Sequence, residues 1–98
     1  MADDIRFDWD EANIAHIARH KVTPEEVAQV FANGPADREY RHVKGEDRYT
    51  ILGHTDNLRV LLVVWTDRNG MVRPVTAREA GKRVRGDYFR EAGEKWKD

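Results

Sequence analysis

The sequence predicts an α+β fold in which a small antiparallel β-sheet, connected as a meander, packs against two N-terminal helices and one C-terminal helix. Three observations support this prediction. Two helix-start signals stand in the first third of the chain, three strand-like runs follow in its middle, and a third helix-start signal precedes a basic C-terminal segment. A chain of 98 residues is long enough for one domain, so we expect residues 1–98 to form a single unit.

The N-terminal segment predicts a short strand followed by two helices. Residues 5–9 alternate apolar and charged side chains, which is typical of a half-buried strand. Asp10 is a favoured N-cap for the first helix. The second helix begins in the stretch VTPEEV, where Thr23 and Glu26 have the spacing of a capping box, and it ends at NGP.

The middle of the chain predicts a meander of three strands, over 47–54, 58–66 and 71–77. The run 58–66 is almost continuously apolar, so we expect it to be the central strand, covered on both faces. The turn DRNG supplies a glycine where a hairpin needs positive φ. Pro74 has no N–H to donate, so the third strand should lie at an edge or beside a bulge.

A C-terminal helix is predicted to begin at Thr76, because Thr76 and Glu79 form another capping-box pattern. An apolar stripe with helical spacing continues from there, formed by Ala77, Ala80, Val84, Tyr88, Ala92 and Trp96. The same segment gathers four cations, Arg78, Lys82, Arg83 and Arg85. In the first turn of a helix, an arginine and the free N–H groups would together hold a phosphate.

Charge is distributed unevenly along the chain. Residues 1–57 carry seven Lys or Arg against twelve Asp or Glu, whereas residues 58–98 carry ten against six. This asymmetry predicts a two-sided molecule whose basic surface meets an anion or an acidic partner. The net charge of −1 is unusual for a dedicated binder of duplex nucleic acid.

The side chains present exclude some kinds of chemistry. The chain contains no cysteine and no serine, which excludes disulfides, cysteine-ligated zinc and catalysis by either nucleophile. No apolar run reaches the roughly 20 residues that span a bilayer, and the acidic N-terminus lacks the apolar core of a signal peptide. We therefore expect a cytoplasmic protein that makes no membrane contact and uses no cofactor.

Two pairs of polar residues have the spacing of functional sites. His16 and His20 are four apart on the first predicted helix, like a zinc-binding pair, but the general-base Glu of that motif is missing and no third ligand is evident. We predict no metal there. Glu46 and Arg48 are two apart on a strand, so they share a face and form either an acid–base pair beside a groove or a surface salt bridge.

RNA cleavage is compatible with this inventory, because the substrate's own 2′-hydroxyl is the nucleophile and the protein supplies only cations and proton-transfer groups. With these motifs placed, the chain resembles BrnT, the toxin of a type II toxin–antitoxin system, whose fold is related to the RelE ribonucleases. The resemblance rests on the order of five blocks: FDWDEAN, RHKVTPEEVAQVF, GEDRY, LLVVWTDRNG and VTAREAGKRVRGDYF.

The resemblance implies an endoribonuclease toxin that blocks translation, and a co-encoded ribbon-helix-helix antitoxin (BrnA-like) that neutralises it in a hetero-oligomer. By position it implies roles for five residues, His20, Glu46, Arg48, Arg78 and Arg83. The arginines at 78 and 83 would hold phosphate, Glu46 or His20 would transfer protons, and Arg48 would position Glu46 or the phosphate. Lys82 and Arg85 are further RNA-binding candidates.

Two departures from the family pattern are visible. Lys21 stands where the family has glycine after the histidine, and Val84 stands in KRVR where the family reads KRER. The first alters the helix end, and the second removes a carboxylate whose role passes to no other residue. The alternative to an enzyme is a non-catalytic interaction or RNA-binding module that uses the basic C-terminal helix.

Overall fold

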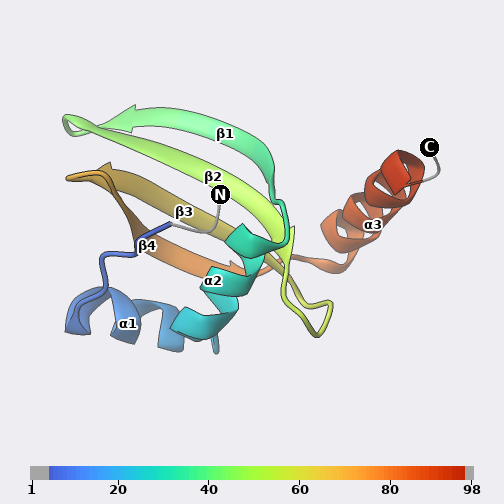
Figure 1. Ribbon diagram of the computed structural model, residues 1–98, viewed down its shortest axis with the longest axis horizontal. Coiled ribbons are helices and arrows are strands. Elements are labelled where there is room, and N and C mark those ends of the chain that lie inside the picture. Colours follow the sequence, from blue (N-terminus) through green and yellow to red (C-terminus); the bar gives the residue numbers. More distant parts are fainter. Residues whose placement is uncertain (1–4, 97–98) are drawn as a thin grey trace.

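The computed structural model describes residues 5–96, with side chains as far as residue 93, as three helices and one four-stranded antiparallel sheet (Figure 1). The helices are α1 (Glu11–Ala18), α2 (Pro24–Ala32) and α3 (Lys82–Trp96). The strands are β1 (Ala36–Val43), β2 (Glu46–His54), β3 (Val60–Arg68) and β4 (Met71–Glu79), which lie in the sheet in chain order. The predicted α+β class is confirmed.

Both N-terminal helices begin at the predicted caps. The side chain of Asp10 accepts the N–H of Asn13 at 2.9 Å, and the side chain of Asn13 accepts the N–H of Asp10 at 2.8 Å. Thr23 and Glu26 make the same reciprocal pair, at 3.2 and 3.1 Å. Each box satisfies backbone donors that the first turn of a helix leaves free, which fixes where α1 and α2 start.

The meander follows the sequence prediction closely. Asn69 and Gly70 in the β3–β4 turn have φ of 56° and 79°, the two positive values of a tight hairpin turn. Pro74 lies on the edge strand β4, opposite Trp65 and next to a shift in register, so it breaks no ladder hydrogen bond in the middle of the sheet.

Strand β1 was missed, and the predicted strand over 5–9 is wrong. β1 has the sequence ADREYRHV, and its six inner residues are exposed, so no apolar alternation marks it. Residues 5–9 contribute a single parallel bridge, between Phe7 and Val72, beside the edge of β4.

The predicted helix start at Thr76 is also wrong. β4 continues to Glu79, and α3 begins only at Lys82. The strand continues because β3 offers partners for its last residues: Leu62 pairs with Arg78, and Val63 pairs with Ala77, which is fully buried in the core. A helix that began at Thr76 would lose these ladder hydrogen bonds and the burial of Ala77. Together they outweigh the local capping pattern.

The main hydrophobic core lies between the sheet and the two N-terminal helices. Ile17 of α1 and Val27 and Val30 of α2 are fully buried there against Leu61 and Val63 of β3. Helix α2 approaches β2 so closely that a Cβ added to Gly53 would stand 2.7 Å from Val30 Cγ1. This tight contact explains a glycine in the interior of a strand.

A smaller cluster joins the opposite face of the sheet to α3, which lies at one end of the sheet (Figure 1). Val84 and Tyr88 pack there on Val60, and the Tyr88 hydroxyl lies 2.7 Å from Nδ1 of His54. Burial raises the pKa of Tyr88. The rest of this face is uncovered, so the expectation that β3 is covered on both faces holds only at its first residues. The predicted stripe residue Trp96 has a side chain outside the described residues.

Replacing Leu58 by glycine is expected to stabilise the protein. Leu58 lies between β2 and β3 with φ of 64° and is 60% exposed, so its side chain contributes little burial while its backbone occupies the left-handed region. That conformation destabilises a non-glycine residue by about 1–2 kcal/mol. Glycine avoids this strain but loses more backbone entropy on folding, which offsets part of the gain. We expect a gain of about 0.5–1 kcal/mol by thermal or urea unfolding. Leu58→Ala keeps the Cβ and is the control; equal stability of the two variants would contradict the explanation.

Candidate functional site

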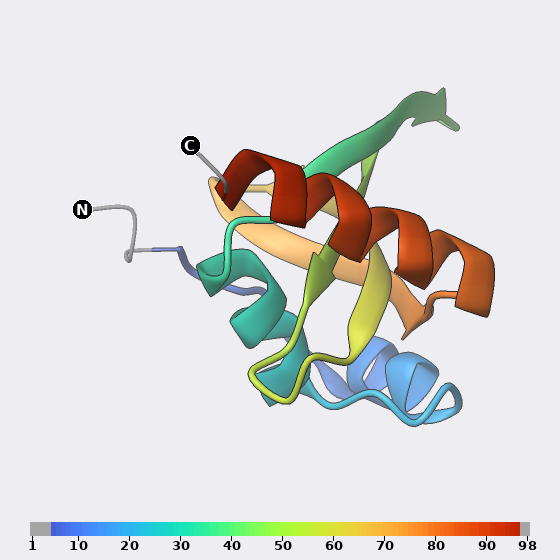
Figure 2. The same cartoon turned by 90° about the vertical axis from the view of Figure 1, so that its right-hand side faces the viewer.

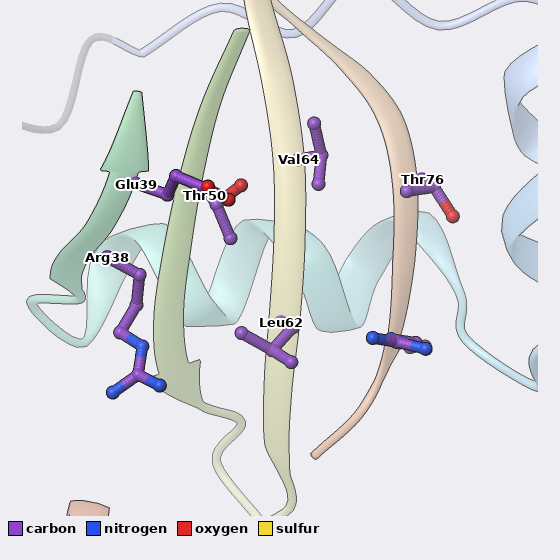
Figure 3. Close-up of a pocket in the computed structure, with 7 residues that line it drawn as sticks. Arg38, Glu39, Thr50, Leu62, Val64 and Thr76 are labelled. Atoms are coloured by element: carbon purple, nitrogen blue, oxygen red, sulfur yellow. The ribbon is translucent and has the colours of Figure 1, made fainter. Parts of the chain in front are cut away.

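The uncovered face of the sheet is hollowed into a groove, which we call the sheet groove (Figure 3). We call the cavity lined by all four strands the main cavity; it has a volume of about 450 Å³. All four strands line it, through Arg38, Glu39, Thr50, Leu62, Val64, Thr76 and Arg78. None of the three helices in the described part of the chain lines this cavity, so the side chains that point outward here can contact a ligand.

Strand periodicity explains why Arg78 points into the groove. Arg78 pairs across the sheet with Leu62, whereas Ala77 pairs with Val63 on the core side. Successive side chains alternate between faces, so a buried Ala77 places Arg78 on the open face. Arg78 is therefore a groove residue held by a strand, and the predicted position at a helix N-terminus is wrong.

Two arginines enter the main cavity from the outer strands. Arg38 comes from β1 and Arg78 from β4, and both are exposed. Within the part of the chain whose side chains are described, neither lies within ion-pair distance of a carboxylate. Unpaired guanidiniums that face one cavity favour an anionic ligand, which they can bind through charge-assisted hydrogen bonds.

The groove continues along β2 toward the β1–β2 turn. A cavity of about 310 Å³ shares Glu39, Thr50 and Val64 with the main one and adds Arg41 and Arg48. Arg48 Nε donates to the carboxylate of Glu46 at 3.0 Å, which confirms that the predicted pair shares a face. Both side chains are more than one third exposed, so their interaction is screened and available to substrate.

His16 lines a cavity together with Glu46 and Arg48, whereas His20 does not. A third cavity of about 320 Å³ is lined by His16 of α1, by Glu46 and Arg48, and by Thr66, Arg73 and their neighbours. His20 follows α1, is exposed and does not line this cavity, although its ring centroid is 5.9 Å from that of His16. The i, i+4 spacing places both rings on one side of the helix, and only the fold distinguishes them.

The basic residues of α3 lie apart from the strand-lined cavities. Lys82, Arg83 and Arg85 are exposed on α3, and none of them lines the main cavity. Figure 2 shows α3 crossing in front of the sheet, with α1 and α2 below. The predicted functional residues therefore divide into a groove set, Glu46, Arg48 and Arg78, a helix set, Lys82, Arg83 and Arg85, and His20 alone.

A second polar cluster occupies the other face of the β1–β2 hairpin. Asp47 accepts a hydrogen bond from the Tyr40 hydroxyl at 2.7 Å and lies 2.8 Å from Nδ1 of His42. These contacts, first with His42 and then with Tyr40, lower the pKa of Asp47, while the carboxylate raises the pKa of Tyr40. The sequence analysis did not single out these residues. Asp47 also lines a cavity of about 570 Å³ at the β1–β2 turn, together with Glu46 of the groove set.

In the part of the chain that the structure describes, no three His, Asp or Glu side chains are grouped closely enough to hold a metal ion. No helix there has the length and apolar character to cross a membrane.

An open antiparallel sheet packed on helices, with two arginines lining one groove, defines the class of the protein: a small α+β domain. The chain belongs to the family of BrnT, the ribonuclease toxin of type II toxin–antitoxin systems, whose family model matches residues 9–83. The match includes every strand and ends in the first turn of α3. No curated protein matches the chain.

Proposed function

We propose that this protein is an endoribonuclease toxin that cleaves RNA in the sheet groove, inhibits translation in doing so and is neutralised by a cognate antitoxin. The observation that supports this most is the convergence of Arg38, Arg48 and Arg78 on one uncovered face that also carries Glu46. Because the family is described as a ribonuclease toxin, we take the anionic ligand to be RNA. We assign that family activity to the groove.

The proposed reaction needs positioned cations and two proton transfers. The 2′-oxygen of the substrate bonds to the adjacent phosphorus, the bond from phosphorus to the 5′-oxygen breaks, and a 2′,3′-cyclic phosphate remains. One protein group takes the proton of the 2′-hydroxyl and another gives a proton to the 5′-oxygen. Arg78 and Arg48 would stabilise the charge on the phosphoryl oxygens.

We assign proton transfer to Glu46 and His16. These two line one cavity with Arg48, which holds the Glu46 carboxylate at 3.0 Å. This replaces His20, which was the histidine chosen by resemblance. Imidazole and carboxylate side chains are among the groups that most often act as general acids and bases in enzymes.

We expect His16→Ala to lower the cleavage rate about 10²-fold or more, the usual contribution of a positioned general acid or base. His20→Ala is the matched control, since it removes the same group four residues away on the same exposed side, and its rate should stay within about twofold of wild type. Steady-state cleavage of a short fluorescent RNA measures both. If His20→Ala is the slower enzyme, the assignment to His16 is wrong.

The exposed cations of α3 are proposed to contact the substrate or the antitoxin outside the reacting site. Lys82 and Arg85 would hold flanking phosphates, and Arg83 would meet an acidic segment of a BrnA-like ribbon-helix-helix antitoxin in the toxin–antitoxin complex. Because these residues lie outside the main cavity, they also favour a second candidate function, a non-catalytic module that binds RNA or an acidic protein through α3.

Cleavage by the purified protein distinguishes these functions. We expect RNA products that end in a 2′,3′-cyclic phosphate, formed equally well with EDTA present, together with growth arrest when the protein is produced from a tightly controlled promoter. Binding of RNA without cleavage would favour the non-catalytic module. Cleavage that disappears with EDTA and returns with a divalent ion would contradict the metal-independent reaction.

A further inference from the structure

Glu39 is an unexpected residue in a groove that binds a polyanion. It is the one carboxylate among the residues that line the main cavity, and two arginines line the same cavity. Its Oε2 accepts a hydrogen bond from Arg41 Nε at 3.0 Å, and its side chain is 51% exposed. A carboxylate there repels phosphates, so any favourable contact it makes must be with hydrogen-bond donors of the ligand.

The groove floor beside Glu39 has an apolar part. Leu62 and Val64 project from the central strand β3 and are only half buried, and Leu62 packs against the cluster of Leu52, Val60 and Ala80. Figure 3 shows Glu39 reaching from β1 over β2 toward Thr50, with Leu62 and Val64 beside them. An apolar floor with a polar group at its edge is the arrangement that binds the flat face of an unpaired base and reads its edge.

The two arginines fit the phosphates on either side of such a base. Arg38 and Arg78 stand on β1 and β4, which are three strand spacings apart, or about 14 Å. Both side chains line the cavity that lies between these strands. The groove therefore has cations at its margins and, between them, a partly apolar floor with one carboxylate.

Among the four RNA bases, guanine matches a carboxylate best. Its Watson–Crick edge presents two adjacent donors, N1–H and the N2 amino group, and a carboxylate accepts both. Adenine and cytosine present one amino group next to an acceptor nitrogen, and uracil presents one N–H between two carbonyl oxygens. In these three bases an acceptor faces one oxygen of the carboxylate and is repelled.

We propose that the main cavity of the sheet groove is a binding site for one unpaired guanine of the RNA substrate, with Glu39 as the residue that selects it. The proposal rests on the proposed ribonuclease function. It adds a base preference: cleavage occurs next to guanine. A bidentate contact to a base edge discriminates by roughly 5- to 150-fold, so the preference should be of that size.

The test uses four short RNAs that differ only in the base at one position, together with two variants. Wild-type protein should cleave the guanine RNA roughly 5- to 150-fold faster than the others. Glu39→Gln keeps the shape but presents one acceptor and one donor, which matches adenine and cytosine, so the preference should move away from guanine. Asp37→Asn on the same strand is the control; Asp37 pairs with Ile51 on the core side, and its loss should leave the preference unchanged.

A binding measurement keeps the proposal separate from the ribonuclease function. Calorimetric titration should show 5′-GMP binding wild-type protein more tightly than 5′-AMP, and this difference should vanish in Glu39→Gln. Guanine-selective binding without cleavage of any RNA would overturn the ribonuclease function and leave the guanine site standing. Cleavage without base preference, or a preference that Glu39→Gln retains, would overturn the guanine site alone.

Discussion

Replacing Arg78 by alanine is expected to slow RNA cleavage about 10²–10³-fold, the usual effect of removing one preorganised donor to transition-state charge. Arg78 is exposed at the margin of the sheet groove, and no carboxylate of the described side chains neutralises it. Its removal opens no core cavity, so the thermal midpoint should stay close to that of wild type. Arg78→Lys keeps the charge but loses the planar fork of donors and should recover only part of the rate.

Arg83→Ala is the matched control for this variant. Arg83 is an equally exposed arginine five residues later, but it lies on α3 and outside the main cavity. We expect its loss to change the cleavage rate less than tenfold. A larger effect at Arg83 than at Arg78 would move the reacting site from the sheet to α3, as the sequence-based helix at Thr76 implied.

Leu61→Ala is expected to reduce the free energy of unfolding by about 2–5 kcal/mol. Leu61 is fully buried in the core between the sheet and the N-terminal helices. A domain of this size has a total stability of roughly 5–15 kcal/mol, so the variant should lose a large part of it. Urea unfolding followed by circular dichroism measures the change.

Leu62→Ala, one residue later, provides the comparison. Leu62 points to the opposite face, where it is half exposed in the groove, so truncation removes less burial and leaves no closed cavity. We expect a loss below about 1.5 kcal/mol, together with weaker RNA binding if the groove floor holds a base. Equal destabilisation by the two variants would show that the groove face is covered in solution.

The elements that the sequence predicted correctly are those with strong local signals. The cap residues Asp10 and Thr23 act within three residues of themselves, so their helices could be placed without knowledge of the fold. The β3–β4 hairpin is similar, since Asn69 and Gly70 accept positive φ independently of the rest of the fold. Strand β1 has no comparable signal, because its inner residues are exposed and its pairing with β2 is its main reason to be extended.

The segment after Thr76 shows how tertiary structure overrides a local pattern. Thr76 and Glu79 have capping-box spacing, yet both belong to β4, because β3 offers them ladder partners and Ala77 is buried in the core. The prediction that Arg78 stands at a helix N-terminus is wrong for the same reason. The pairing of Glu46 with Arg48 was predictable from the period of a strand, whereas the positions of Arg78 and His16 depend on which face the assembled sheet leaves open.

Methyl resonances on the two faces of β3 report where RNA binds. We would titrate the isotope-labelled protein with an RNA in which every 2′-hydroxyl is replaced by hydrogen, so that it binds without being cleaved. The methyl groups of Leu62 and Val64 should shift on binding, while those of Leu61 and Val63, which face the core, should stay nearly unchanged. Saturable binding that leaves Leu62 and Val64 unshifted and perturbs only residues of α3 would contradict the sheet groove as the RNA-binding face.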